Sequence, residues 1–168
     1  MKSILMSIQS KWLCEILNGR KTAELRKRFP KDYRGWVYLY CTKAKPYLIG
    51  YFGRYFITDY LDPEVKDGLV KNGLVVARVW VEKIDYVKNC DAEDIIFRSC
   101  LTLDEIQAYG FSVNLLAIEI AELAIFKKPK ELNDFSVDHS AKWHMPIKAP
   151  ITKAPQSWQY IYIEEEKL

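Results

Sequence analysis

Strand-like segments are spread along the whole chain, and they constrain its fold more than any other feature. Residues 4–8 form a short apolar run, residues 35–43 (GWVYLYCTK) are β-branched and aromatic, and residues 74–84 are long enough to cross the centre of a sheet. Residues 157–163 (SWQYIYI) close the chain with a further strand. Because these segments lie far apart in the sequence, they predict an α+β protein whose mixed, mostly antiparallel sheet curls into a β-barrel flanked by a few helices.

The length and the cysteine pattern predict a single domain, residues 1–168, in a reducing compartment. A chain of 168 residues can bury a core without disulfides. The four cysteines are scattered and include no CxxC pair, so neither a disulfide framework nor a zinc knuckle is expected. The apolar runs are shorter than the roughly 18 residues that span a bilayer. We therefore expect a cytoplasmic protein with no membrane contact and no cofactor.

Two helices are predicted among the strands. Residues 13–17 have helical spacing and are followed by Asn18-Gly19, a pair that ends helices. Residues 102–105 (TLDE) form a capping box that opens a second helix, which ends at Gly110.

Three segments are less regular. Residues 46–73 and 133–155 look like loops that contain several Gly, Pro or polar residues. Residues 115–126 (LLAIEIAELAIF) have the composition of a helix, but their alternation also allows a strand.

The segment NGRKTAELRKR concentrates charge where a helix ends and a strand begins. Its alternation places Glu24, Arg26 and Arg28 on one face of the strand, with Lys21 at the junction. Arginine offers a planar fork for a phosphate or a base edge, whereas lysine acts as a point charge. If this cluster is a binding site, Lys21→Ala and Arg26→Ala should weaken ligand binding with little change in thermal stability. The alternative is an inert, salt-bridged and solvated strand face.

The first third of the chain is basic. Residues 1–60 hold 12 Lys and Arg against 4 Asp and Glu, a net charge of +8. Such a surface can attract a phosphate-bearing partner, unless the acidic middle of the chain neutralises it in the folded protein.

The charged segment also resembles a known family signature. GRKTAELR (19–26) has the form GxKTxExR, which resembles the signature of the ASCH domain, a branch of the PUA-like superfamily. Later segments resemble further blocks of a subgroup found in bacteria and their phages, namely YLYCTKAKPYL (38–48), SCLTLDEIQAY (99–109), IFKKPKEL (125–132) and APQSWQYI (154–161). The resemblance implies a PUA-like barrel with a cleft beside the GxKTxExR segment. It also implies that residues 115–126 are largely strand.

The resemblance implies that this cleft binds RNA or a nucleotide, and residue types suggest which side chains take part. The basic and aromatic mix at residues 40–43 suits base stacking and a phosphate contact, while Gln156 can bond a base edge and Trp158 can stack. The alternative for Tyr40 and Trp158 is a place in the core. The candidate ligand-binding residues are Lys21, Glu24, Arg26, Arg28, Tyr40, Thr42, Lys43, Gln156 and Trp158.

A hydrolase acting on a modified nucleoside or on RNA is an alternative function. Some members of the superfamily resemble amidohydrolases of acetylated cytidine, whose site has a Lys in GRKT, a Thr three residues further on and a distant Glu. Lys21 matches, but Glu24 stands at the Thr position. The distant Glu has three unassigned candidates, Glu82, Glu105 and Glu119. Lys21 and Glu24 are thus the candidate catalytic residues of an amidohydrolase- or ribonuclease-like enzyme, and the sequence leaves open whether the chain is an enzyme.

A second alternative is a phage-associated regulator that binds a protein partner. The Tyr-rich residues 47–60 could form its contact surface, or that of a homodimer, unless they fold over the barrel as a hydrophobic loop.

A metal site is not expected in the loop that holds both histidines. The spacing of Asp138, His139 and His144 fits no standard ligand pattern. A basic lid that contains Lys142 and Trp143 is expected there instead.

Overall fold

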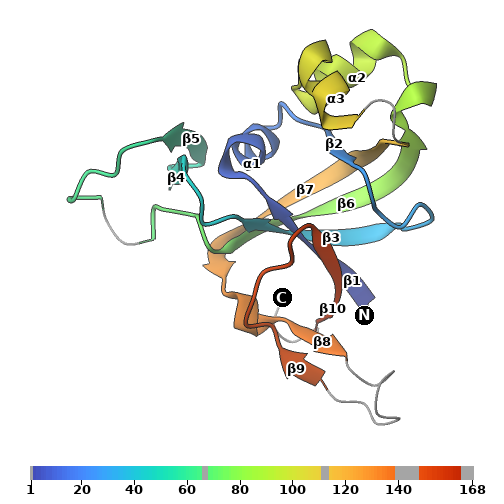
Figure 1. Cartoon of the computed structure of the whole chain (residues 1–168). Helices are drawn as coiled ribbons and strands as arrows, with labels where there is room; N and C mark the ends of the chain where they lie inside the picture. Colours follow the sequence, from blue (N-terminus) through green and yellow to red (C-terminus); the bar gives the residue numbers. More distant parts are fainter. Residues whose placement is uncertain (1, 66–67, 111–113, 139–147, 164–168) are drawn as a thin grey trace.

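The computed structural model describes residues 2–65, 68–110, 114–138 and 148–163. It consists of one large sheet, helices packed against that sheet, and a separate two-stranded hairpin (Figure 1). The expected lid residues Lys142 and Trp143 lie outside the described residues. In chain order the elements are β1 (Lys2–Ile8), α1 (Ser10–Leu17), β2 (Ala23–Arg26), β3 (Gly35–Cys41), β4 (Tyr47–Tyr51), β5 (Arg54–Thr58), β6 (Val75–Tyr86), α2 (Ala92–Ser99), α3 (Leu103–Gly110), β7 (Leu116–Lys130), β8 (Ser136–Asp138), β9 (Lys148–Pro150) and β10 (Trp158–Tyr162), with short 3-10 helices at Val87–Asn89 and Leu132–Asp134.

Within the described residues, the large sheet has eight strands in the order β2-β7-β6-β3-β1-β10-β8-β9. β1 and β3 are parallel, and the other neighbouring pairs are antiparallel. The prediction of a mixed, mostly antiparallel sheet with a few helices is therefore confirmed.

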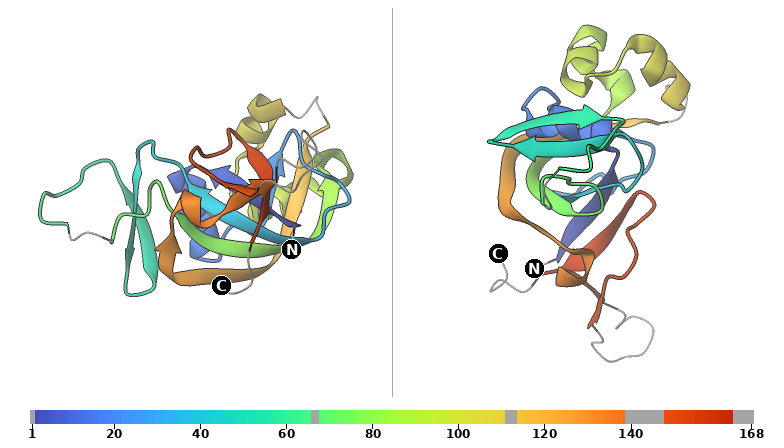
Figure 2. Two further views of the ribbon diagram at one scale, coloured as in Figure 1. Left: turned by 90° about the horizontal axis from the view of Figure 1, so that it is seen from below. Right: turned by 90° about the vertical axis from the view of Figure 1, so that its left-hand side faces the viewer.

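Among the described residues the sheet curves but does not close, so the prediction of a β-barrel is wrong. Its outer strands are β2 and β9, which do not pair with each other in the part of the chain that the structure describes. β8 and β9 continue the sheet away from β2 instead of returning to it (Figures 1 and 2). The long strands β6 and β7 carry register shifts, which bend the sheet locally.

Both faces of the sheet are buried at β1. Alternation along β1 sends Ile4 and Met6 to the face that α1 covers, in the largest apolar cluster. Leu5 points to the opposite face, where it packs with Phe135 and Ile151 from the segments around β8 and β9.

α2 and α3 form a small layer over β2 and the start of β7. Ile95 of α2 and Ile106 of α3 share a third apolar cluster with Ala23 and Leu25 of β2. α2 was not predicted from the sequence, although Asp91 caps its first turn. No helix among the described residues has the length and apolar character needed to cross a bilayer.

Two segments that look like loops in the sequence contain strands. Residues 46–73 include β4 and β5, and residues 133–155 include β8 and β9. These strands are only three to five residues long, and each is paired with its neighbour, β4 with β5 and β8 with β9. The ambiguous residues 115–126 lie almost entirely in β7, which confirms the strand that the family resemblance implies.

The β4–β5 hairpin forms a separate two-stranded sheet to one side of the large sheet (Figure 1), and Leu48 of β4 is fully buried in the largest apolar cluster. Phe52 is 88% exposed and Tyr60 is 72% exposed. Asn18, at the end of α1, ties the hairpin to the body of the protein through hydrogen bonds with the backbone of Tyr55.

Candidate functional site

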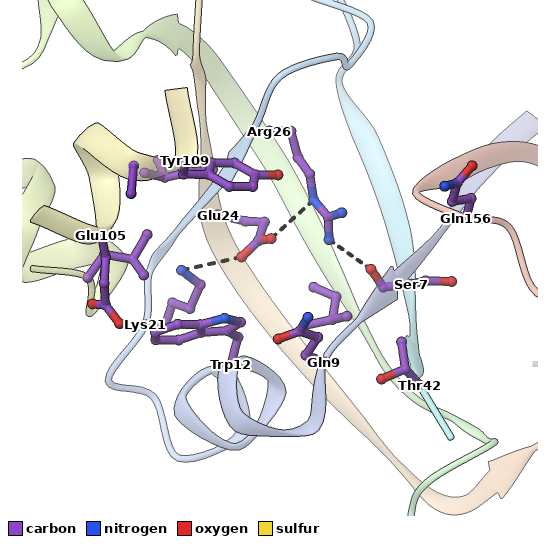
Figure 3. Close-up of a pocket in the computed structure, with 14 residues that line it drawn as sticks. Ser7, Gln9, Trp12, Lys21, Glu24, Arg26, Thr42, Glu105, Tyr109 and Gln156 are labelled. Atoms are coloured by element: carbon purple, nitrogen blue, oxygen red, sulfur yellow. Dashed lines mark hydrogen bonds and ion pairs between the residues drawn. The ribbon is translucent and has the colours of Figure 1, made fainter. Parts of the chain in front are cut away.

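A pocket of about 570 Å³ opens beside β2, between the start of α1 and α3 (Figure 3). The segments that form it are distant in the sequence. They meet because β1 pairs with both β3 and β10, while β2 packs against α3. The lining residues are Ser7, Ile8, Gln9, Trp12, Lys21, Glu24, Leu25, Arg26, Thr42, Leu101, Glu105, Ala108, Tyr109 and Gln156.

The backbone after α1 directs the charged segment into the pocket. Gly19 has a φ of 74°, a left-handed conformation that glycine adopts without strain. Thr22 N then donates to Arg98 O, and Ile120 N donates to Thr22 O. The chain therefore enters β2 fixed from both sides, and the side chain of Glu24 faces the pocket (Figure 3).

Lys21 is buried at the base of the pocket, with only 2% of its surface exposed. Its Nζ donates to Ser99 O at 2.6 Å and lies 3.3 Å from Glu24 Oε2. Ser99 is the last residue of α2, so the ammonium also meets the negative end of that helix dipole. The Trp12 ring lies 5.4 Å from the same Nζ. Lys21 therefore joins α2 to β2 as well as facing the pocket.

Glu24 stands between two cations. Its Oε2 faces Lys21, and its Oε1 lies 3.1 Å from Arg26 Nε, although without hydrogen-bond geometry at that nitrogen. Arg26 Nη2 donates to Ser7 O at 2.8 Å, and Nη1 lies 3.4 Å from Ser157 Oγ. β1 and the segment before β10 thus hold the guanidinium in place, with 12% of the side chain exposed.

The cluster of Lys21, Glu24 and Arg26 holds two formal positive charges and one negative charge. Buried charges are costly unless they are paired, and one carboxylate cannot neutralise both cations. The cluster therefore favours an anionic or electron-rich group beside it.

Uncharged side chains complete the pocket wall. Thr42 Oγ1 is buried and makes no hydrogen bond within the described residues. Gln9 and Gln156 bring amide groups to the same wall, and Trp12 and Tyr109 flank the charged cluster (Figure 3). Two aromatic rings and three neutral polar groups suit a planar ligand with hydrogen-bonding edges.

Glu105 is the one candidate for the distant Glu of a hydrolase that lines the pocket. Its carboxylate accepts from Thr102 N at 2.8 Å, and this bond lowers the pKa of Glu105 below its ordinary value. Lys11 Nζ lies 3.7 Å away. Glu82 and Glu119 lie outside the pocket.

Five of the nine candidate ligand-binding residues from the sequence line this pocket. They are Lys21, Glu24, Arg26, Thr42 and Gln156. Strand pairing brings them together from the beginning, the first third and the end of the chain.

The other four candidates lie elsewhere. Tyr40 is buried in the apolar cluster on the opposite face of the sheet. Lys43 is exposed, and its stem passes Gly73. Arg28 and Trp158 line a second hollow, where Trp158 Nε1 donates to Arg28 O at 2.8 Å.

Sequence reasoning missed Gln9, Trp12 and Tyr109. Tyr109 lies in one of the segments that resemble the family, residues 99–109, and this location was the available signal for it. Only the packing of α1 and α3 determines which faces of these helices turn toward the pocket.

The described residues contain no group of three or more His, Cys, Asp and Glu side chains placed to hold a metal ion. His139 and His144 lie outside the described ranges.

Comparisons with known proteins identify the fold. Neither a protein-family model nor a curated protein sequence matches the chain. The crystal structure of ASCH from Zymomonas mobilis matches with a TM-score of 0.59 and 14% identity, covering 98% of this chain and 90% of that one. Crystal structures of two mutants of the same protein match at 14% identity, with TM-scores of 0.57 and 0.54, covering 99% and 98% of this chain and 94% and 90% of theirs. The chain therefore has the fold of the ASCH domain proteins.

Proposed function

We propose that the pocket beside β2 binds RNA or a nucleotide. One observation carries this proposal: the buried Lys21–Glu24–Arg26 cluster has an excess of one positive charge and borders an open pocket of about 570 Å³. A phosphate or an electron-rich base edge would complement that excess charge.

The rest of the wall supports the same class of ligand. Trp12 and Tyr109 can stack on a base, and such stacking contributes roughly 1–3 kcal/mol per base. Gln9, Thr42 and Gln156 can donate to and accept from a base edge. The ASCH-type fold agrees with this proposal, since the resemblance in the sequence implies RNA or nucleotide ligands.

The proposal is tested by titrating the protein with single-stranded RNA, single-stranded DNA and mononucleotides at low and moderate salt. Arg26→Ala should weaken binding roughly 10- to 100-fold, because it removes a charge-assisted contact worth about 1.5–3 kcal/mol. Arg20→Ala is the matched control. It removes one positive charge from the same segment, but Arg20 does not line the pocket and pairs with Glu15.

Equal binding by wild type and Arg26→Ala would contradict the proposal. Absence of binding to every nucleic-acid ligand would favour the regulator that acts through a protein partner.

A hydrolase is the second candidate, because Lys21 Nζ and Glu24 Oε2 lie 3.3 Å apart and Glu105 lines the same pocket. A buried Lys–Glu pair can transfer protons to and from a bound substrate. Incubation with RNA and with N-acetylated cytidine, followed by separation of the products, tests this candidate. Turnover that disappears in Glu24→Gln while binding persists would support it.

A further inference from the structure

A second hollow of about 480 Å³ lies beside the first pocket, where the chain leaves β2. Its walls come from residues 27–31, the end of β6, the start of β7 and β10. The charged residues that line it are all basic, namely Lys27, Arg28 and Lys31. The hollow also includes Arg28 and Trp158, two candidate ligand-binding residues that the first pocket does not use.

Aromatic rings alternate with these cations. Lys31 Nζ lies 4.3 Å from the centre of the Tyr86 ring, and Lys2 Nζ lies 3.8 Å from that of Tyr160. Trp158 packs edge-on against Tyr160, with ring centroids 5.5 Å apart. A half-buried Trp and Tyr beside exposed cations form the combination that holds single strands of nucleic acid, by stacking bases and attracting the backbone.

The Trp158 ring is held in position and is not merely a surface side chain. Its Nε1 donates to Arg28 O at 2.8 Å, and its ring contacts the buried Phe29 with centroids 5.6 Å apart. The same hydrogen bond fixes the backbone of Arg28 beside the ring, so the ring is preorganised next to the chain that carries the cation.

The second hollow adjoins the first pocket at two places. Along β2, Arg26 lines the first pocket, and the next residue, Lys27, lines the second hollow. The Nζ of Lys27 lies 5.1 Å from the ring of Tyr109, which lines the first pocket. Before β10, Ser157 contacts Arg26, and the next residue, Trp158, lines the second hollow. A chain of linked phosphates could therefore occupy both hollows, whereas a free mononucleotide could fill only one.

We propose that the second hollow binds the backbone and flanking bases of a single-stranded nucleic acid whose neighbouring nucleotide occupies the first pocket. This inference rests on the proposed function and narrows it: the ligand is a polynucleotide, not a free nucleotide. Lys27, Arg28 and Lys31 contact phosphates, and Trp158 and Tyr86 stack on bases.

The test compares a mixed-sequence hexamer, as RNA and as DNA, with the four ribonucleoside monophosphates over a range of salt concentrations. The double variant Arg28→Ala/Lys31→Ala removes two exposed cations from the second hollow. Lys127→Ala/Lys128→Ala is the matched control, since it removes two exposed cations from β7, away from both hollows. Thermal unfolding of both variants checks that they fold.

We expect the hexamer to bind wild type more tightly than any monophosphate does. In the double variant Arg28→Ala/Lys31→Ala, called the hollow variant below, the hexamer should bind no more tightly than a monophosphate. Log K falls as log salt rises, and each lost phosphate contact makes that slope shallower by about 0.7, so the double variant should make it shallower by about 1.4. Monophosphate binding should not change in either variant. If RNA and DNA bind equally, the protein recognises the phosphates and the bases. If RNA binds more tightly, the protein also contacts the 2′-hydroxyl groups.

Two results would overturn the inference. If monophosphates bind and the hexamer binds no more tightly, the second hollow is not a strand site, although the proposed function survives. The same holds if the hollow variant retains the full affinity and salt slope for the hexamer. If neither hexamer nor monophosphate binds, the proposed function fails together with this inference.

Discussion

Lys21 and Arg26 belong to the same charged cluster, but they differ in how deeply they are buried and in which part of the protein they contact. Lys21 is 2% exposed and donates to the carbonyl oxygen at the end of α2, whereas the Arg26 side chain is 12% exposed and borders the open pocket. The sequence predicts that substitution at either position spares stability. The burial of Lys21 changes that expectation for this residue.

Replacing Lys21 by Met should lower the free energy of unfolding by about 1–3 kcal/mol. The change leaves Ser99 O without its donor and takes one partner from Glu24, although Arg26 still faces that carboxylate. Urea unfolding of wild type and Lys21→Met measures the difference. Lys11→Met, which removes an exposed lysine from α1, is the control. Unchanged stability in Lys21→Met would show that the buried hydrogen bond contributes little.

At the scale of elements, α3 forms one wall of the pocket, and its first turn is stabilised as the sequence predicts. Thr102 N donates to Glu105 Oε2, and Glu105 N donates back to Thr102 Oγ1, so the predicted capping box is confirmed. Glu105 and Tyr109 of this helix both line the pocket, which links the stability of the helix start to the shape of the site.

The capping box should make stability depend on pH in the acidic range. The bond from Thr102 N lowers the pKa of Glu105 in the folded protein. The ionised carboxylate therefore stabilises the fold above its unfolded pKa of about 4.3, and this contribution is lost as pH falls through the folded value. Glu105→Gln, which retains the box without the charge, should be less stable than wild type at pH 7 by at most about 1 kcal/mol, because the group is largely exposed.

The difference between wild type and Glu105→Gln should shrink as the pH falls below about 4. Urea unfolding at a series of pH values gives the comparison, with the exposed Glu122→Gln as control. A constant difference across this range would contradict the role of the ionised carboxylate.

At the scale of the whole molecule, the centre of the sheet should protect its cysteine from reaction. Cys41 on β3 is fully buried, and burial raises the pKa of its thiol to about 12. Because the thiolate is the reactive form, Cys41 should resist alkylation by iodoacetamide at pH 8 in the folded protein and react after unfolding. Mass spectrometry of peptides compares it with the partly exposed Cys90 and Cys100. Rapid labelling of Cys41 in the native protein would contradict the burial of this residue at the centre of the sheet.

Local patterns predict part of this molecule, and long-range pairing decides the rest. The capping box at residues 102–105 follows from a short-range pattern. The strand at the start of β7 was implied by the family resemblance, because its local pattern allows both a helix and a strand. The closed barrel was wrong because strand number and alternation do not determine whether β8 and β9 return to β2. The strands at 46–73 and 133–155 are only three to five residues long and stand among Gly, Pro and polar residues, so their pairing could not be predicted from local sequence.

The pocket residues also divide into those that local sequence patterns predict and those that depend on long-range packing. The alternation of one strand was enough to group Glu24 with Arg26, and Lys21 lies at the junction just before that strand. Tyr40 was placed with them because its residue type suits stacking, but the alternation of β3 turns it to the other face of the sheet. Trp12 shows the reverse case, since only the packing of α1 brings it to the pocket.

The most direct test of the central claim is to map where a short single-stranded RNA contacts the protein, by its effect on backbone amide NMR signals. If the pocket beside β2 binds the RNA, the largest shifts should fall on residues 21–26 and 101–109 and on Gln156. In Arg26→Ala the same shifts should need roughly 10- to 100-fold more RNA. Shifts confined to the exposed β4–β5 hairpin, or no shifts at saturating RNA, would contradict a nucleic-acid site in this pocket.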